Sequence, residues 1–265
     1  MPTSYIGKPP SDLKHCIELC WSEKSTGQQK CSFYEVYPDS NVKLVFRFSR
    51  LKYRMVLVGP ITEKATIEID HTSDYFGFRF HPGHAPRIVD VKEADMVDST
   101  VDVESIAGKS VEALSLQLSE LQNHEDRQRI MENLIRTTLP SSKNERCLLA
   151  AELIRSQSGQ LKISELAYQL GIHVRTLERL FQNEVGLSPK KIIRHVRLRK
   201  VMEHIYIGTH NTLGELAYFC GYADQSHMIR EFKELTGKLP GDPEACDPMP
   251  IEGSPSTRII HRHKP

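Results

Sequence analysis

Apolar and polar side chains alternate with a period of two residues in the segment 31–91, most clearly over 42–48. Successive side chains of a β-strand point to opposite faces of its sheet, so this alternation predicts half-buried strands. The polar sequence Pro38-Asp39-Ser40-Asn41 predicts a turn before residues 42–48. Further short apolar runs are separated by Gly59-Pro60 and Pro82-Gly83. Several short strands with such breaks predict a small β-barrel or a sandwich.

The period changes to three and four residues after position 110, where Val111, Leu114, Leu118 and Leu121 recur. This spacing predicts an amphipathic helix, and the same pattern continues to Leu139 in a second helix. Two interpretations of the first apolar stripe are open. Either it is a dimer seam of the coiled-coil kind, which we favour, or it packs on the β domain.

A third pattern begins near residue 163, where short helical stretches are separated by single glycines. Ser164 is expected to cap the first helix, and Gly171 to end it. Ala167 is small enough to let two helices cross closely, so the stretch predicts a helix-turn-helix unit. The apolar faces of its two helices consist of Leu166, Ala167, Leu170, Leu177, Leu180, Phe181 and Val185.

The unit occurs a second time later in the chain. Glu165-Leu166-Ala167-Tyr168 and Gly171 are matched by Glu215-Leu216-Ala217-Tyr218 and Gly221, and Asp224 is expected to cap the second helix of this copy. A repeat array needs about three units to bury a continuous core. We therefore expect two modules that perform the same task side by side.

A longer helix is predicted between the two units. Ser188 and Pro189 form a good N-cap and first-turn pair, and the helical pattern continues to about Ile205. At about 1.5 Å per residue such a helix spans roughly 27 Å, close to the pitch of duplex DNA at about 34 Å. The second helix of each unit is polar and partly basic, so the pair is suited to successive major grooves.

Several short motifs recur between residues 144 and 240. They are both Glu-Leu-Ala-x-x-x-Gly units, Arg179-Leu180-Phe181, Gly186-Leu187-Ser188-Pro189, Arg197-Leu198-Arg199 and Gly221-Tyr222. With these motifs, residues 144–240 resemble the DNA-binding domain of the AraC/XylS family of bacterial transcription regulators. The resemblance implies an all-α domain of two helix-turn-helix units joined by a long helix. The chain departs from the family pattern after Pro240.

The resemblance places base contacts on the second helix of each unit. Arg can pair with guanine, Gln with adenine, and Glu can accept a hydrogen bond from cytosine. For Arg179 and Arg230 an intramolecular ion pair is an equal alternative, because both occupy the same repeated position. We expect base contacts from Arg175, Thr176, Glu178, Arg179, Gln225, Ser226, His227 and Arg230, and phosphate contacts from Lys190, Lys191 and Arg194.

The order of a β domain, a helical pair, a linker and a double helix-turn-helix domain is also that of the AraC/XylS family, in which the first half senses a signal or mediates dimerisation. The segment 77–83 resembles a subset of these regulators, but this resemblance does not identify a ligand. We expect an α+β chain with a β-rich sensor or dimerisation domain over 1–139, a linker over 140–143, the DNA-binding domain over 144–240, and a Pro-rich disordered tail over 241–265.

Charge is almost balanced over the whole chain, with 35 Lys and Arg against 34 Asp and Glu. From residue 141 onward there are 18 Lys and Arg against 14 Asp and Glu, whereas residues 1–140 carry 17 against 20. The local basic excess fits a DNA-binding half. No apolar run of about eighteen residues and no apolar signal-peptide core are present. We therefore expect a cytoplasmic, nucleoid-associated protein that does not enter the membrane.

The sequence thus predicts a transcription regulator that is not an enzyme and has no cofactor. We expect an activator, since activation is the commoner habit of the family. Its expected partners are double-stranded promoter DNA and RNA polymerase, with a small-molecule effector and a homodimer as open alternatives. The alternative function is an enzyme fused to the same DNA-binding module, such as a DNA-repair methyl acceptor that holds zinc in a cysteine cluster.

The N-terminal half offers two weaker candidates for a ligand site. The sets Cys16, Cys20, Cys31 and His71, His81, His84 lack the paired short spacing of a zinc site, so we expect no metal. Aromatic side chains can line a ligand cavity or fill an ordinary core, and we favour the core. The aromatic residues concerned are Trp21, Phe46, Tyr75 and Phe78.

Overall fold

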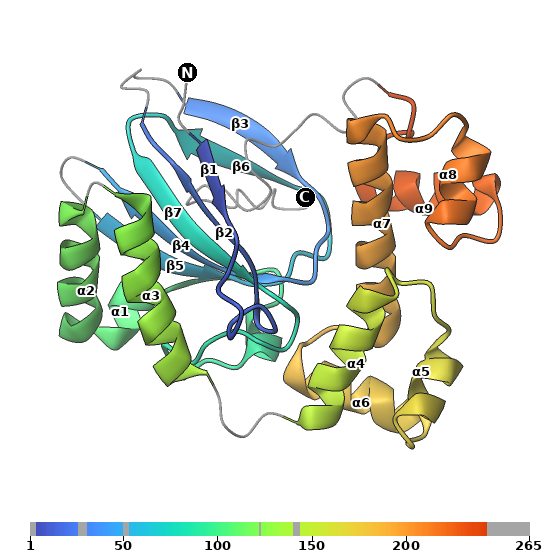
Figure 1. Cartoon of the computed structure of the whole chain (residues 1–265), viewed down its shortest axis with the longest axis horizontal. Coiled ribbons are helices and arrows are strands. Elements are labelled where there is room, and N and C mark those ends of the chain that lie inside the picture. Colours follow the sequence, from blue (N-terminus) through green and yellow to red (C-terminus); the bar gives the residue numbers. More distant parts are fainter. Residues whose placement is uncertain (1–3, 26–30, 50–52, 122, 140–143, 243–265) are drawn as a thin grey trace, which may run out of the picture.

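The structure, a computed structural model, describes residues 4–25, 31–49, 53–121, 123–139 and 144–242. Figure 1 shows a β-rich region, formed by the N-terminal half, beside a group of helices formed by the C-terminal half. The expected linker over 140–143 lies outside the described residues, as does the expected tail from residue 243 onward.

The β-rich region consists of two antiparallel sheets. The larger sheet has the strand order β1-β2-β7-β4-β5-β8, and the smaller one pairs β3 with β6. The strands are β1 (Ser4–Gly7), β2 (Ile17–Glu23), β3 (Cys31–Val36), β4 (Val42–Phe48), β5 (Tyr53–Val58), β6 (Ala65–Asp70), β7 (Asp74–Phe80) and β8 (Thr100–Asp102).

Both faces of the larger sheet are buried. On β4, Leu44 and Phe46 belong to a core that also contains residues of the N-terminal helices, whereas Val45 packs towards β3 and β6. This is the two-residue alternation of the sequence, with successive side chains on opposite faces. Because the two sheets pack face to face, the region is a sandwich, and the alternative of a closed barrel is not adopted.

The four aromatic residues that were candidates for a ligand cavity fill these cores. Trp21 and Tyr75 belong to the core between the sheets, and Phe46 and Phe78 belong to the core under the helices. Each has at most 1% of its surface exposed. The prediction of an ordinary core is confirmed for these side chains.

Three helices cover the outer face of the larger sheet: α1 (Val103–Ala107), α2 (Lys109–Glu120) and α3 (His124–Thr138). The apolar stripe that we favoured as a dimer seam lies on α2 and at its end. All four of its residues pack into the core with the sheet, so that interpretation is wrong for this stripe. The apolar face of the sheet requires a cover, and α2 supplies it. The stripe consists of Val111, Leu114, Leu118 and Leu121.

The C-terminal half is helical throughout its regular elements. Among the described residues no helix is both long enough and apolar enough to cross a lipid bilayer. A short 3-10 helix, η1 (Glu93–Met96), precedes β8 and lies next to this half. The helices are α4 (Glu145–Ser156), α5 (Ile163–Gln169), α6 (Val174–Glu184), α7 (Pro189–Ile207), α8 (Leu213–Phe219) and α9 (Gln225–Thr236).

The two helix-turn-helix units are formed by α5 with α6 and by α8 with α9. Ala167 and Ala217 are buried at 2% and 1% exposure, as the close helix crossing requires. The hydroxyl of Ser188 and the carboxylate of Asp224 cap α7 and α9 as predicted. The expected cap at Ser164 is wrong, because α5 already begins at Ile163 and the Glu165 carboxylate accepts a hydrogen bond from the Lys162 amide.

Candidate DNA-binding surface

Helix α6, the second helix of the first unit, has one buried and one exposed face. Leu177 and Phe181 are fully buried, so the three-residue and four-residue steps leave the opposite face in solvent. The candidate base-contacting residues lie on that face or beside it. Arg175, Glu178 and Arg179 are exposed, and Thr176 is half-buried.

Helix α9 repeats this arrangement in the second unit. The Asp224 carboxylate accepts a hydrogen bond from the His227 amide at 2.7 Å and fixes the first turn. Met228 and Phe232 are buried beneath the helix. Gln225, Ser226 and Arg230 are exposed, whereas the half-buried His227 ring packs edge-on against Tyr222 at 5.3 Å. The His227 side chain therefore has a packing role whether or not it meets a base.

The repeated arginines have no intramolecular role that the structure records. Arg179 and Arg230 are exposed, and neither makes an ion pair among the described residues. The alternative of an internal ion pair at these positions is therefore wrong for this conformation. Their contact with bases stays a prediction.

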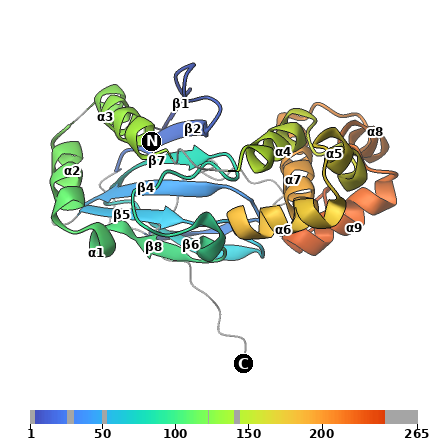
Figure 2. The same cartoon turned by 90° about the horizontal axis from the view of Figure 1, so that it is seen from below.

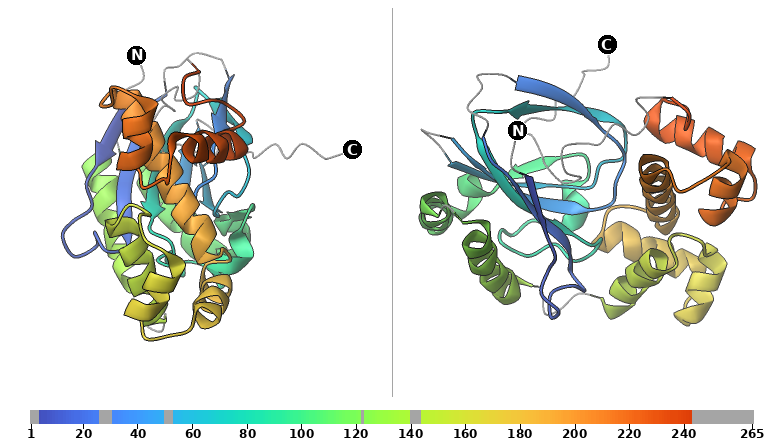
Figure 3. Two further views of the ribbon diagram at one scale, coloured as in Figure 1. Left: turned by 90° about the vertical axis from the view of Figure 1, so that its right-hand side faces the viewer. Right: turned by 45° about the horizontal axis from the view of Figure 1, so that its top comes forward.

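Helices α6 and α9 lie on the same side of α7. Figure 2 shows both along the lower edge of the helical domain, with α4, α5 and α8 along its upper edge, and the left panel of Figure 3 agrees. Helix α7 connects the two units as one continuous helix of 19 residues. At about 1.5 Å per residue it is roughly 28 Å long, which is near the pitch of a DNA duplex.

The predicted phosphate contacts divide into two groups. Lys190 and Lys191 are exposed in the first turn of α7 and are available to a ligand. Arg194 instead bridges two carboxylates of α9, with Glu231 at 3.0 Å and Glu234 at 2.8 Å. Burial would lower the pKa of Arg194, but the two carboxylates raise it above its ordinary value. Arg194 thus holds α7 and α9 together, and this structure does not support the prediction that it contacts a phosphate.

Most of the remaining basic side chains of α7 also form contacts within the protein. The Arg197 guanidinium lies 3.1 Å from the Glu231 carboxylate and 4.7 Å above the Tyr222 ring. The Lys200 ammonium lies 4.3 Å above the ring of Phe219 and donates a hydrogen bond to its carbonyl oxygen. The basic stripe on α7 therefore mainly ties the second unit to the connecting helix.

Sequence reasoning missed Glu231 as a residue of this surface. Glu231 is 7% exposed, and its carboxylate accepts hydrogen bonds from Arg194 and Arg197 of α7. It thereby fixes the orientation of α9, the helix that presents Gln225 and Arg230. The local signal is an acidic residue within the apolar stripe of α9, between Met228 and Phe232, and its partners are 34 and 37 residues away.

The N-terminal cysteines do not assemble the cluster that the alternative enzyme would need. Cys16 and Cys20 are buried, whereas Cys31 is exposed. Burial raises the pKa of the Cys20 thiol to about 12, which opposes formation of a thiolate. Over the described residues, no group of three His, Cys, Asp or Glu side chains is placed to hold a metal ion.

Comparison with known protein families divides the chain into two matched parts. Residues 144–243 match a family model described as a helix-turn-helix domain. Residues 7–102 match another, described as a domain of unknown function (DUF6597). The first match coincides with the helical half, and the second ends at the last residue of β8.

Curated relatives match less than a third of the chain. The HTH-type transcriptional activator RhaS of Yersinia pestis (strain Pestoides F) is 31% identical over 78 residues, which make up 29% of this chain and 28% of that protein. RhaS of Yersinia pseudotuberculosis (serotype O:1b, strain IP 31758) matches to the same extent. The chain thus spans little more than a quarter of the length of these relatives.

Two solved structures show limited similarity to the chain. The C-terminal domain of AraT, a response regulator from Geobacillus stearothermophilus, is 22% identical with a TM-score of 0.37, covering 47% of this chain and 95% of that one. ToxT from Vibrio cholerae O395 is 9% identical with a TM-score of 0.39, covering 80% of this chain and 95% of that one.

Proposed function

We propose that this chain, whose C-terminal half is an AraC-type helix-turn-helix domain, is a sequence-specific DNA-binding transcription regulator. One observation carries the proposal: α6 and α9 lie on the same side of α7, and most of their candidate base-contacting side chains are exposed. A duplex that passes along this side can receive one helix in each of two successive major grooves.

The exposed residues have the chemistry that base recognition needs. The Arg175 guanidinium can donate two hydrogen bonds to the O6 and N7 atoms of guanine, and the Gln225 amide can pair with adenine. Glu178 can accept a hydrogen bond from cytosine N4. Thr176, Arg179, Ser226, His227 and Arg230 complete the proposed base-contacting set, and Lys190 and Lys191 supply phosphate contacts.

Three more detailed inferences follow from this proposal: the effect on transcription, the place where the protein acts, and the role of the β domain. We infer that the protein activates transcription through a contact with RNA polymerase, since the curated relatives that match part of the chain are named activators. We infer that it acts in the cytoplasm, where promoter DNA lies. A signal, such as a small molecule, or a second copy of the chain would act through the β domain.

Selection of bound duplexes from a random pool tests the proposal. The protein should enrich one extended sequence with two separated conserved blocks, and its affinity should fall steeply between about 50 and 200 mM salt. Arg175→Ala should lose about 1–3 kcal/mol of discrimination at a guanine position. Arg146→Ala is the matched control, because Arg146 is exposed on α4, on the opposite side of the domain.

The proposal fails if the selected pool shows no preferred sequence, or if binding does not respond to salt. It also fails in its assignment of Arg175 if both variants discriminate between target and random duplex as the wild type does.

A further inference from the structure

A glutamine side chain connects the first helix-turn-helix unit to the second. Gln160 lies in the turn between α4 and α5, and its side-chain amide donates a hydrogen bond of 2.7 Å to the carbonyl oxygen of Phe219. Phe219 is the last residue of α8, so this carbonyl has no partner within the helix. The contact therefore runs from the turn before the first unit to the end of α8 without passing through α7.

The Gln160 side chain also packs against Gly221, which follows α8. A Cβ atom at Gly221 would lie 2.5 Å from Cγ of Gln160, and the three nearest atoms all belong to that side chain. The carbonyl of Phe219 accepts a further hydrogen bond from the Lys200 ammonium of α7 at 3.0 Å. Gly221 has a positive φ of 79°, so glycine at this position both ends the helix and leaves room for Gln160.

The matching position of the first unit is open. Gly171 corresponds to Gly221 in the repeat and also has a positive φ, of 63°. A Cβ atom at Gly171 would meet no described atom within 4 Å. The two positions share a backbone conformation, but the second is covered by a side chain from outside its own unit. The contact of Gln160 is therefore not a general feature of the repeated module.

The turn that carries Gln160 is fixed against α4 and α7. The amide of Gly159 donates a hydrogen bond to the carbonyl oxygen of Ile154 in α4 at 2.8 Å. Gly159 is buried, and a Cβ atom there would lie 2.9 Å from the carbonyl oxygen of Ile193 in α7. The backbone of the turn thus lies directly on α7, and the Gln160 side chain extends to Phe219 from a defined position.

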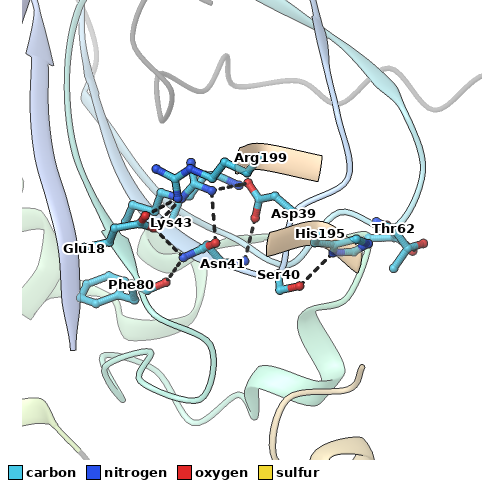
Figure 4. Close-up of polar contacts among 11 residues, drawn as sticks. Glu18, Asp39, Ser40, Asn41, Lys43, Thr62, Phe80, His195 and Arg199 are labelled. Atoms are coloured by element: carbon cyan, nitrogen blue, oxygen red, sulfur yellow. Dashed lines mark hydrogen bonds and ion pairs between the residues drawn. The ribbon is translucent and has the colours of Figure 1, made fainter. Parts of the chain in front are cut away.

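This contact is separate from those that α7 makes with the β domain. Figure 4 shows Glu18 meeting Arg199 of α7 in an ion pair. Beside it, the Ser40 hydroxyl and the His195 ring nitrogen Nδ1 lie 2.8 Å apart. His195 follows Ile193 by two residues, which is about 200° around a helix of 3.6 residues per turn. The turn before α5 and the β domain therefore contact nearly opposite faces of α7.

Helix α7 also joins the two units, but a different apolar core lies at each end of it. Ile192 and Ile193 belong to the core of the first unit, and Leu198 and Val201 to that of the second. Long helices bend readily, so a second connection beside α7 opposes bending between the cores. Figure 2 shows α4, α5 and α8 on one side of α7 and α6 and α9 on the other. The contact of Gln160 therefore lies away from α6 and α9.

We propose that Gln160 is a positioning residue that fixes the spacing and the relative angle at which α6 and α9 enter DNA. One extra base pair between the two blocks of a site rotates one block by about 34° relative to the other. A hydrogen bond of 2.7 Å between Gln160 and Phe219 does not survive such a rotation of the units. Gln160 thus favours one spacing of the blocks without touching DNA. The inference rests on the proposed DNA-binding function.

Gln160→Met tests this role in the full-length chain, because methionine has a similar length but no N–H donor. The measurement compares the affinity for the selected site with that for the same site lengthened by one base pair between its blocks. The wild type must break the hydrogen bond to bind the lengthened site, whereas the variant has none to break. The preference for the original spacing should therefore fall on the order of fivefold. Binding to a duplex with one block should be unchanged.

A steric variant removes the same contact from the other side. Gly221→Ala places a Cβ atom against the Gln160 side chain and should displace it. Gly171→Ala is its matched control, because alanine there meets the same unfavourable positive φ but no neighbouring atom. The control for Gln160→Met is Gln157→Met, since Gln157 is exposed in the same turn. Both controls should keep the spacing preference of the wild type.

Residual dipolar couplings of the free protein report the relative orientation of the two units without DNA. One alignment should describe both units in the wild type and in the controls, whereas Gln160→Met and Gly221→Ala should each require two.

The outcomes separate the positioning role from the proposed function. A weaker spacing preference in folded Gln160→Met or Gly221→Ala, and in neither control, supports the role. An unchanged preference in both variants, or an equal loss in the controls, overturns it. If the wild type selects no sequence, the proposed function is wrong, and the couplings then decide on Gln160 alone. A single alignment in both variants would show that Gln160 does not hold the two units in place.

Discussion

Side chains that are available to DNA differ from those that stabilise the fold, because the latter already form ion pairs within the chain. Arg175 and Gln225 are exposed on their helices, whereas the Arg194 side chain is only 19% exposed and lies between two carboxylates. An arginine in such an ion pair cannot turn to a phosphate without leaving buried Glu231 without one of its cations. The residue type alone therefore does not identify a DNA contact.

Gln225→Ala should remove the preference for adenine at one position of the second block of the selected site. The amide is the group that pairs with adenine N6 and N7, so we expect a loss of about 1–3 kcal/mol at that position alone. Competition binding with duplexes changed at single positions measures the effect. The control is Gln169→Ala on α5, exposed on the opposite side of the domain. Equal losses in the two variants would contradict the assignment.

His81 and His195 should make the fold less stable as the pH falls below about 6.5, the ordinary pKa of the group. Burial lowers the pKa of each to about 4. Between these values the unfolded chain binds protons that the folded chain does not, so stability is full above about pH 6.5 and is lost towards pH 4. The loss should reach on the order of 1–2 kcal/mol per histidine at pH 5.

Urea unfolding at pH 7 and pH 5 measures this dependence. Because the pKa values of Glu18 and Asp39 are lowered, their contribution to stability is lost mainly below about pH 4.5, outside the interval. His195→Gln should flatten the change between the two pH values, because one titrating group is removed. A variant with the same change as the wild type would show that His195 does not titrate in this way.

At the scale of elements, the sequence predicted the helix caps and exposed helix faces, because interactions between residues close in sequence determine them. Ser188 and Asp224 cap their helices because each side chain bonds a backbone amide three residues away, and such a signal is contained in a few letters. The exposed faces of α6 and α9 follow from apolar spacing in the same way. The role of Arg194 could not be predicted, because its partner Glu231 lies 37 residues away and meets it only after α7 and α9 have packed.

Glu231→Gln should disturb the orientation of α9 and leave α6 unaffected. Loss of the carboxylate leaves Arg194 and Arg197 facing each other in a partly buried place, so we expect on the order of 2 kcal/mol lower stability. Discrimination should weaken in the block of the DNA site read by α9, and the block read by α6 should be unchanged. Binding to duplexes altered in one block at a time distinguishes this from a general loss of stability.

Glu234→Gln provides the comparison for that variant, because Glu234 contacts the same Arg194 but its side chain is 64% exposed. It should have little effect, as for surface ion pairs in general. A uniform loss across both blocks in Glu231→Gln would show that the residue supports the domain as a whole and does not position α9.

At the scale of the whole molecule, the arrangement of elements depends on contacts that are remote in sequence. The alternation of apolar and polar residues over 42–48 predicted buried strands. It is equally compatible with a barrel and a sandwich, because it does not determine whether the sheet closes on itself. The apolar stripe from Val111 to Leu121 likewise predicts a buried helix face but does not determine which part of the protein packs against it. Glu18 and Arg199 are separated by 181 residues, and no local pattern in either segment predicts their ion pair.

The continuous helix α7 should make DNA binding sensitive to the spacing between the two blocks of the site. A duplex turns once in about 10.5 base pairs, so about five extra base pairs between the blocks rotate one of them to the opposite side. Because α6 and α9 lie on one side of a single helix of 19 residues, they cannot follow that rotation. We expect the altered duplex to bind with the affinity of a duplex that carries only one block. Equal binding of the original and lengthened sites would show that the two units are not held at a fixed spacing.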